Sequence, residues 1–143
     1  MNNNGNEQNG IAEILRVILI LQQNASCPDS VLDSCDRPVL GCCTTCCVCN
    51  TRPVMIYTCC PNGATPLEMP ISKDIVDPTE DELSNVFRVE KVEDNTATFR
   101  VLAPNPDTTT GANPYVSTNS FFTLNLDCCC VIRCLNDTCV DCL

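Results

Sequence analysis

The sequence predicts a mainly β protein: an antiparallel β-sandwich or small barrel, preceded by a short N-terminal helix, with a cysteine-rich N-terminal arm and a C-terminal tail. Apolar and polar residues alternate in three segments of the second half, whereas residues 11–23 follow the period of a helix. At 143 residues the chain is long enough for one hydrophobic core and short for two. We expect three parts: an arm, helix and cysteine-rich segment in residues 1–49, a β domain in residues 50–135, and a cysteine-containing tail in residues 136–143.

The N-terminal part combines a polar arm with the helix. Residues 1–10 are asparagine-rich and lack periodicity, which is typical of a disordered arm. The apolar stripe of the helix consists of Ile11, Ile14, Leu15, Ile18 and either Leu21 or Gln22. A run of about a dozen apolar residues is too short for a membrane span, which needs about 20. We expect the helix to pack on its own sheet or on a neighbouring subunit.

The first predicted strand lies in residues 50–60. Pro53 is tolerated at its start, and Val54, Ile56 and Thr58 share one face. The turn signal Pro61-Asn62-Gly63 follows, so residues 64–70 are expected to return as an edge strand.

An acidic segment, residues 72–85, separates this unit from the next. Asp77-Pro78-Thr79-Glu80 predicts a single helical turn with Asp77 as its N-cap. A calcium loop is the alternative for these carboxylates, but their spacing matches no EF-hand and the segment has no glycine.

Residues 86–93 and 96–103 predict a β-hairpin. A three-residue loop, residues 94–96, gives the better pairing on both faces, because a two-residue loop opposes Val89 to Arg100. The pairs expected with the three-residue loop are Phe87 with Ala103, Val89 with Val101, Lys91 with Phe99 and Glu90 with Arg100.

The longest predicted strand spans residues 120–135, after a polar connection in residues 104–120. Its apolar face consists of Phe122, Leu124, Leu126, Cys128, Cys130, Ile132 and Cys134. We therefore expect Cys128 and Cys130 to be core cysteines and Cys134 to look inward. Cys129 is on the opposite face and is expected to point outward.

Cysteine is the unusual residue of this chain. Nine of the fifteen cysteines lie in residues 27–60 and six in residues 128–142, with none between them. Disulfides, a metal site and simply buried thiols could each account for this density. Disulfides, mostly between chains, are favoured because two cysteine-rich ends on either side of a cysteine-free middle suit a subunit that is joined to its neighbours at its edges. Fifteen is an odd number, so in a fully oxidised state at least one thiol pairs outside the chain or stays free.

Other functional classes fit less well. A net charge of −10 with eight basic residues argues against nucleic-acid binding, and the absence of histidine removes the commonest general base. We find no catalytic constellation, so we expect no enzymatic activity and no cofactor. A thiolate metal-binding protein is the alternative, since residues 42–49 contain CxxC spacings, but this crowded run does not define one site. A redox CxxC is weaker still, because it should open a helix after a strand.

Three motifs carry a resemblance to a known family. They are Asn50-Thr51-Arg52-Pro53 before an aliphatic strand, Phe87-Arg88-Val89-Glu90 leading to Arg100-Val101-Leu102, and Leu126-Asp127-Cys128-x-Cys130-x-Ile132-x-Cys134-Leu135. Because it contains these three motifs in this order, the chain resembles the CotY/CotZ/ExsY family of spore coat and exosporium proteins. The resemblance implies a structural protein made in the mother-cell cytoplasm. It also implies self-assembly on the spore surface into disulfide-crosslinked hexagonal lattices. Cys129 and the run in residues 42–49 depart from the family pattern.

We therefore expect the chain to be joined to copies of itself, and to other coat or exosporium proteins, by intermolecular disulfides. Vicinal cysteines on a strand point to opposite faces, so Cys129 is badly placed to bridge Cys128 or Cys130. The candidates for intermolecular bonds are Cys27, Cys35, Cys42, Cys43, Cys46, Cys47, Cys49, Cys129, Cys134, Cys139 and Cys142.

Overall fold

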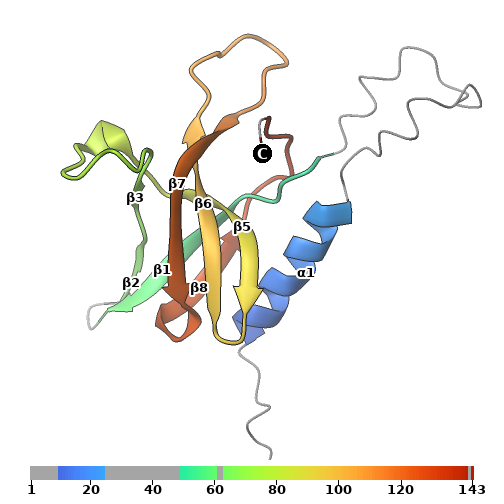
Figure 1. Cartoon of the computed structure of the whole chain (residues 1–143), viewed down its shortest axis with the longest axis vertical. Helices are drawn as coiled ribbons and strands as arrows, with labels where there is room; N and C mark the ends of the chain where they lie inside the picture. Colours follow the sequence, from blue (N-terminus) through green and yellow to red (C-terminus); the bar gives the residue numbers. More distant parts are fainter. Residues whose placement is uncertain (1–9, 25–48, 61–62, 142) are drawn as a thin grey trace, which may run out of the picture.

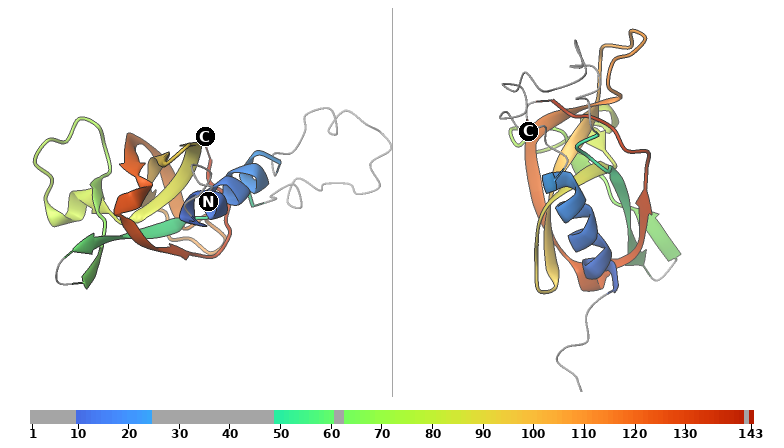
Figure 2. Two further views of the ribbon diagram at one scale, coloured as in Figure 1. Left: turned by 90° about the horizontal axis from the view of Figure 1, so that it is seen from below. Right: turned by 90° about the vertical axis from the view of Figure 1, so that its right-hand side faces the viewer.

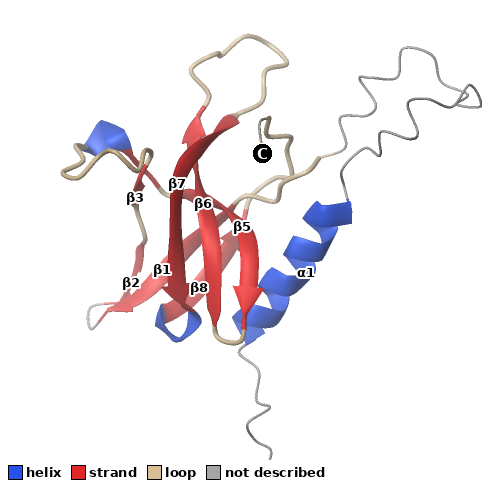
Figure 3. Ribbon diagram, in the orientation of Figure 1, coloured by secondary structure: helices blue, strands red, loops and turns tan. Residues whose placement is uncertain are grey.

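One helix and a curled antiparallel sheet make up most of the structure, a computed structural model that describes residues 10–24, 49–60, 63–141 and 143. Figure 3 shows how strands dominate the chain. The elements are α1 (Gly10–Asn24), β1 (Val54–Cys60), β2 (Gly63–Pro66), β3 (Met69–Pro70), η3 (Glu80–Glu82), β4 (Leu83–Ser84), β5 (Val86–Glu93), β6 (Thr96–Pro104), β7 (Tyr115–Asn125), η4 (Leu126–Cys128) and β8 (Cys129–Cys134). Residues 1–9 of the predicted arm and residues 25–48 of the cysteine-rich segment lie outside the described residues.

The main sheet has the order β2-β1-β5-β6-β7, and β8 also pairs with β1. β1 and β5 are joined at a single residue pair, Val54 with Phe87, so the sheet divides there into a β1–β8 wall and a β5–β6–β7 wall. The two walls face each other as a half-barrel (Figures 1 and 2). The predicted mainly β fold with a short N-terminal helix is confirmed.

Helix α1 covers the open side of the half-barrel beside β5 (Figure 2, right). It buries Ala12, Leu15 and Ile18 in the core. Gln22 anchors its last turn: its side-chain amide donates to the Val89 carbonyl at 2.9 Å and accepts from the Arg52 N–H at 3.0 Å. The helix thus packs on its own sheet, with a stripe that differs from the predicted one. The apolar side chains that it leaves exposed are Ile14, Val17, Ile20 and Leu21.

Three phenylalanines connect the strands of the β5–β6–β7 wall. The ring of Phe122 lies 4.8 Å from that of Phe87 and 5.3 Å from that of Phe99, centroid to centroid. Phe87 and Phe99 are fully buried, and edge-to-face and stacked contacts of this kind add to the free energy of simple burial. Phe122 thus packs against the core, as the alternation of apolar residues predicted.

The β5–β6 hairpin differs from the predicted register. Glu93 pairs with Thr96, which makes the loop two residues long, and Asp94 takes a positive φ of 46° there. The register then shifts by one residue at Glu90, so Val89 faces Phe99 and not Val101. The predicted three-residue loop is therefore wrong. A β-bulge restores the apolar pairing that a two-residue loop alone would lose.

The bulged Glu90 brings a carboxylate between two arginines that face each other across the strands. One oxygen of Glu90 accepts from Arg88 at 2.8 Å and from Arg100 at 3.0 Å. The arginine side chains are only 11% and 18% exposed, so their repulsion would be costly without the shared anion. The predicted pairing of Glu90 with Arg100 is wrong, because Arg100 pairs with Arg88, but the side chains of Glu90 and Arg100 meet in an ion pair.

The predicted strand of residues 120–135 is two strands. β7 starts at Tyr115, inside the expected polar connection, and pairs with β6. The turn η4 then ends it, and the chain crosses to the other wall, where β8 pairs with β1. Asn125 stabilises this break by accepting from the Asp127 N–H at 3.0 Å.

The acidic segment contains the expected helical turn, two residues later than predicted. Thr79 and not Asp77 is the N-cap of η3, and its N–H donates to the carboxylate of Glu82 at 3.0 Å. β3 and β4 flank this turn as a small separate ladder. The expected edge strand of residues 64–70 is divided between β2 and β3.

Candidate functional site

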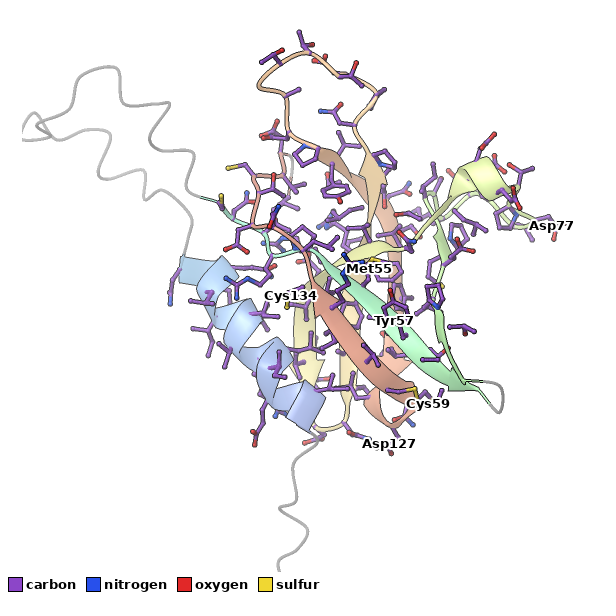
Figure 4. The ribbon with its side chains drawn as sticks, turned by 180° about the vertical axis from the view of Figure 1, so that it is seen from behind. Met55, Tyr57, Cys59, Asp77, Asp127 and Cys134 are labelled. Carbon is purple, nitrogen blue, oxygen red and sulfur yellow. A yellow bond between two sulfur atoms is a disulfide. The ribbon has the colours of Figure 1, made fainter. Side chains whose placement is uncertain are left out.

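Described cysteines cluster at both ends of the β1–β8 pair (Figure 4). We call the end with the Cys59–Cys130 disulfide, Cys128 and Cys129 the bridge end. The end with Cys49, Cys134 and Cys139 is the tail end. Cys134 pairs with Val54, so at about 3.3 Å per residue the disulfide lies about 16 Å farther along β1.

The bridge end carries an intrachain disulfide between neighbouring strands. Cys59 of β1 and Cys130 of β8 have their Cα atoms 5.4 Å apart, within the usual range for a disulfide. Both residues are exposed, and the bond closes a sequence separation of 71. Cys59 was not among the predicted site residues. Strand alternation places it outward with Met55 and Tyr57, but nothing in the sequence indicates that β8 lies beside it.

The orientations predicted for Cys128, Cys129 and Cys130 are reversed. Cys129 is only 7% exposed and packs in the core, whereas Cys128 and Cys130 are exposed. The turn η4 breaks the two-residue alternation after Leu126, so the next inward side chain is that of Cys129. Cys128 and Cys130 are therefore not core cysteines, and Cys129 does not point outward.

A β-bulge and burial complete the geometry of this end. The β1–β8 register shifts between Tyr57 and Thr58, so Cys129 and Ile132 both pack on the core. Burial raises the pKa of the Cys129 thiol, which also donates to the Val131 carbonyl at 3.5 Å. Of Cys128 and Cys129, the two cysteines at this end whose side chains the structure describes besides the disulfide, Cys128 is the exposed one.

At the tail end, hydrogen bonds hold the segment before β1 to the C-terminal tail. Thr51 and Thr138 exchange backbone hydrogen bonds of 3.0 and 2.9 Å. The Asn50 side chain donates to the Val140 carbonyl at 3.0 Å and accepts from its N–H at 2.9 Å. Residues 50–51 therefore fix the start of the tail as another strand would.

An ion pair reinforces this contact. The Arg52 guanidinium donates to both carboxylate oxygens of Asp137, at 2.7 and 2.9 Å. The hydrogen bond from Arg52 lowers the pKa of the Asp137 carboxyl. Around this pair Cys49 and Cys134 are exposed, and Cys139 is half-buried. Cys134 was predicted to look inward and does not.

The described residues on either side of residues 25–48 lie near the tail end. Asn24 is two residues after Gln22, whose side chain accepts a hydrogen bond from the Arg52 N–H, and Cys49 directly precedes Asn50. The remaining candidates are outside the described residues: Cys27, Cys35, Cys42, Cys43, Cys46, Cys47 and Cys142.

Within residues 10–24, 49–60, 63–141 and 143, no three His, Cys, Asp or Glu side chains gather where they could hold a metal ion. No described helix is long and apolar enough to span a bilayer.

The structure is thus that of a cysteine-rich β protein, a half-barrel closed by one helix. Exposed thiols lie at both ends of its β1–β8 pair, so its surface is suited to disulfide chemistry. A family model described as spore coat protein Z matches residues 1–115, and the chain belongs to this family. It is thus a CotY/CotZ-type spore coat protein with a structural role at the spore surface. No curated protein and no solved structure gave a significant match.

The family match and the predicted resemblance cover different parts of the chain. The match includes α1 and the strands up to β6, but it ends at residue 115. The closing cysteine pattern in residues 126–135 lies beyond it. The cysteines of the bridge end, Cys59 excepted, are therefore features of this chain outside the matched region.

Proposed function

We propose that this protein is a self-assembling building block of the spore coat or exosporium, and that intermolecular disulfides join its copies into a lattice or a related assembly. Family membership supports the structural role. The observation that carries the cross-linking is the exposure of Cys49, Cys128 and Cys134 at the two ends of the β1–β8 pair.

The exposure of these thiols on folded subunits favours assembly before oxidation. A disulfide needs the two Cβ atoms within about 4.5 Å of each other, so a thiol of one subunit bonds to that of a neighbour already docked beside it. The subunit is made with reduced thiols in the mother-cell cytoplasm, packs through reversible contacts and is oxidised once its neighbours are in place. Its partners are other copies of this chain and other coat or exosporium proteins, and it has no enzymatic activity.

The tail end provides most of the cross-links in this proposal. Cys49 and Cys134 flank the contact that holds residues 50–51 to the tail, and the cysteine-rich residues 25–48 directly precede Cys49 in the sequence. Several bonds per subunit convert individually weak contacts into a resistant layer.

Non-reducing electrophoresis and electron microscopy of the full chain test this proposal. We expect oxidised protein to form a ladder of covalent species that reductant collapses, together with ordered layers in micrographs. Cys134→Ser should lower the yield of cross-linked species. Cys129→Ser is the matched control, because a buried thiol does not reach a neighbour. Monomers in oxidising buffer, or stoichiometric zinc in the reduced protein, would overturn the proposal.

A further inference from the structure

The bridge end presents an exposed thiol and an exposed disulfide side by side. Cys128 is exposed and is separated from Cys130 by one residue. β8 begins at Cys129, which pairs with Thr58, so Cys128 directly precedes the strand pair that carries the disulfide. Both sulfurs of the Cys59–Cys130 bond belong to exposed residues. One end of the molecule therefore carries both reactants of a thiol–disulfide exchange.

Cys129 does not compete as the nucleophile at this end. Its side chain packs among core residues such as Leu126, and its thiol donates a hydrogen bond to the Val131 carbonyl. A thiolate must reach the disulfide sulfur to attack it, and only a solvent-accessible thiol can reach the disulfide of another molecule. Among the cysteines of this end whose side chains are described, Cys128 is thus the candidate nucleophile.

We propose that Cys128 of one copy attacks the Cys59–Cys130 disulfide of a second copy, and that this exchange links the two copies covalently at their bridge ends. This inference rests on the proposed function, in which copies meet on the spore surface, and it assigns one link and its chemistry.

The step is balanced without an oxidant. The Cys128 sulfur loses its proton and forms a bond to one sulfur of the bridge, while the bond between Cys59 and Cys130 breaks. The other bridge sulfur leaves as a thiolate and takes up a proton. One disulfide is lost and one is gained, so the number of free thiols does not change.

Exchange within one chain leaves the reactive groups intact. If Cys128 displaces Cys130 from Cys59, the chain still carries one disulfide and one free thiol at the same end. Because both reactants share this end, two copies related by a two-fold axis each present a thiol to the other's disulfide. The same contact then forms the link in both directions.

Isotope mixing tests the exchange in the full chain. Equal amounts of unlabelled and ¹⁵N-labelled protein, each with the Cys59–Cys130 bond formed, are mixed under argon with a metal chelator and no oxidant. Disulfide-linked peptides are then sequenced by mass spectrometry. We expect pairs that join residue 59 of one isotope to residues 128–130 of the other, while the total of free thiols stays constant. The variants are Cys128→Ser, which keeps the bridge, and Cys134→Ser as the matched control.

The outcomes separate this inference from the proposed function. Loss of the mixed pairs in Cys128→Ser and their persistence in Cys134→Ser support the exchange. Mixed pairs that persist in Cys128→Ser overturn it. If links between copies form only after an oxidant is added, the exchange is wrong and the proposed function stands. If no links form even then, both are wrong.

Discussion

Removing the Cys59–Cys130 bridge should cost more stability than any other change to the exposed surface. A disulfide acts chiefly by restricting the unfolded chain, and for a sequence separation of 71 the chain-entropy estimate is about 4 kcal/mol at 25 °C. The strands stay paired through the β1–β8 hydrogen bonds, so the fold should persist with reduced stability.

Urea unfolding of the double variant Cys59→Ser, Cys130→Ser measures this effect. With a slope of about 2 kcal/mol per molar urea, the midpoint should fall by about 2 M relative to native protein whose free thiols are alkylated. Cys134→Ser removes an exposed thiol but no bridge of the described part, so its midpoint should not move. A fall of less than about 0.5 M in the double variant would refute the entropic reasoning.

Three further outcomes are expected. Glu90→Gln should lower the free energy of unfolding by about 1–3 kcal/mol in urea melts, because two poorly exposed arginines lose their shared anion; an unchanged melt would show that water replaces the carboxylate. Because Arg52 lowers the pKa of Asp137 from 3.8, the stability from this pair is present above that value and is lost as pH falls through the lower folded pKa. The protection of the tail amides from exchange, measured relative to the intrinsic exchange rate at each pH, should therefore fall on acidification, and Asp137→Asn should abolish that dependence. Maleimide should modify Cys128 in the native protein and Cys129 only after unfolding, since burial shields Cys129 and raises its pKa; equal native labelling would contradict this.

Strong local patterns predicted much of the fold. Val54 and Ile56 alternate as β1 requires and are fully buried, and the helix occupies Gly10–Asn24, close to the expected residues 11–23. The acidic helical turn was found through its proline and capping residues, with the cap displaced to Thr79. In each case the signal comes from neighbours in sequence, which is where propensity and capping act.

The errors arose where distant contacts decide. The start of β7 at Tyr115 has no strong alternation and becomes a strand by pairing with β6. The break at Leu126 lies inside an unbroken apolar pattern, and it alone reversed the predicted faces of the three vicinal cysteines. The bulge at Glu90 reflects two arginines that meet only after the strands pair. No pattern within one segment contains these partners.

The positions of the cysteines in the sequence predicted which thiols form the candidate site, and the structure corrected which of them are exposed. Cys49 and Cys134 were named from the cysteine-dense ends and are exposed. Cys59 was missed, because its partner Cys130 is 71 residues away. Whether the named thiols bond to other chains remains a prediction.

The disulfide also determines how the domain would carry mechanical tension. A pull applied at Cys134 and resisted at Cys59 runs along β8 to Cys130 and then through the sulfur–sulfur bond. That route consists entirely of covalent bonds and bypasses the hydrogen bonds and the hydrophobic core. A subunit pulled between its tail end and its bridge end would therefore transmit the force through β8 and the disulfide, and the rest of the fold would bear little of it.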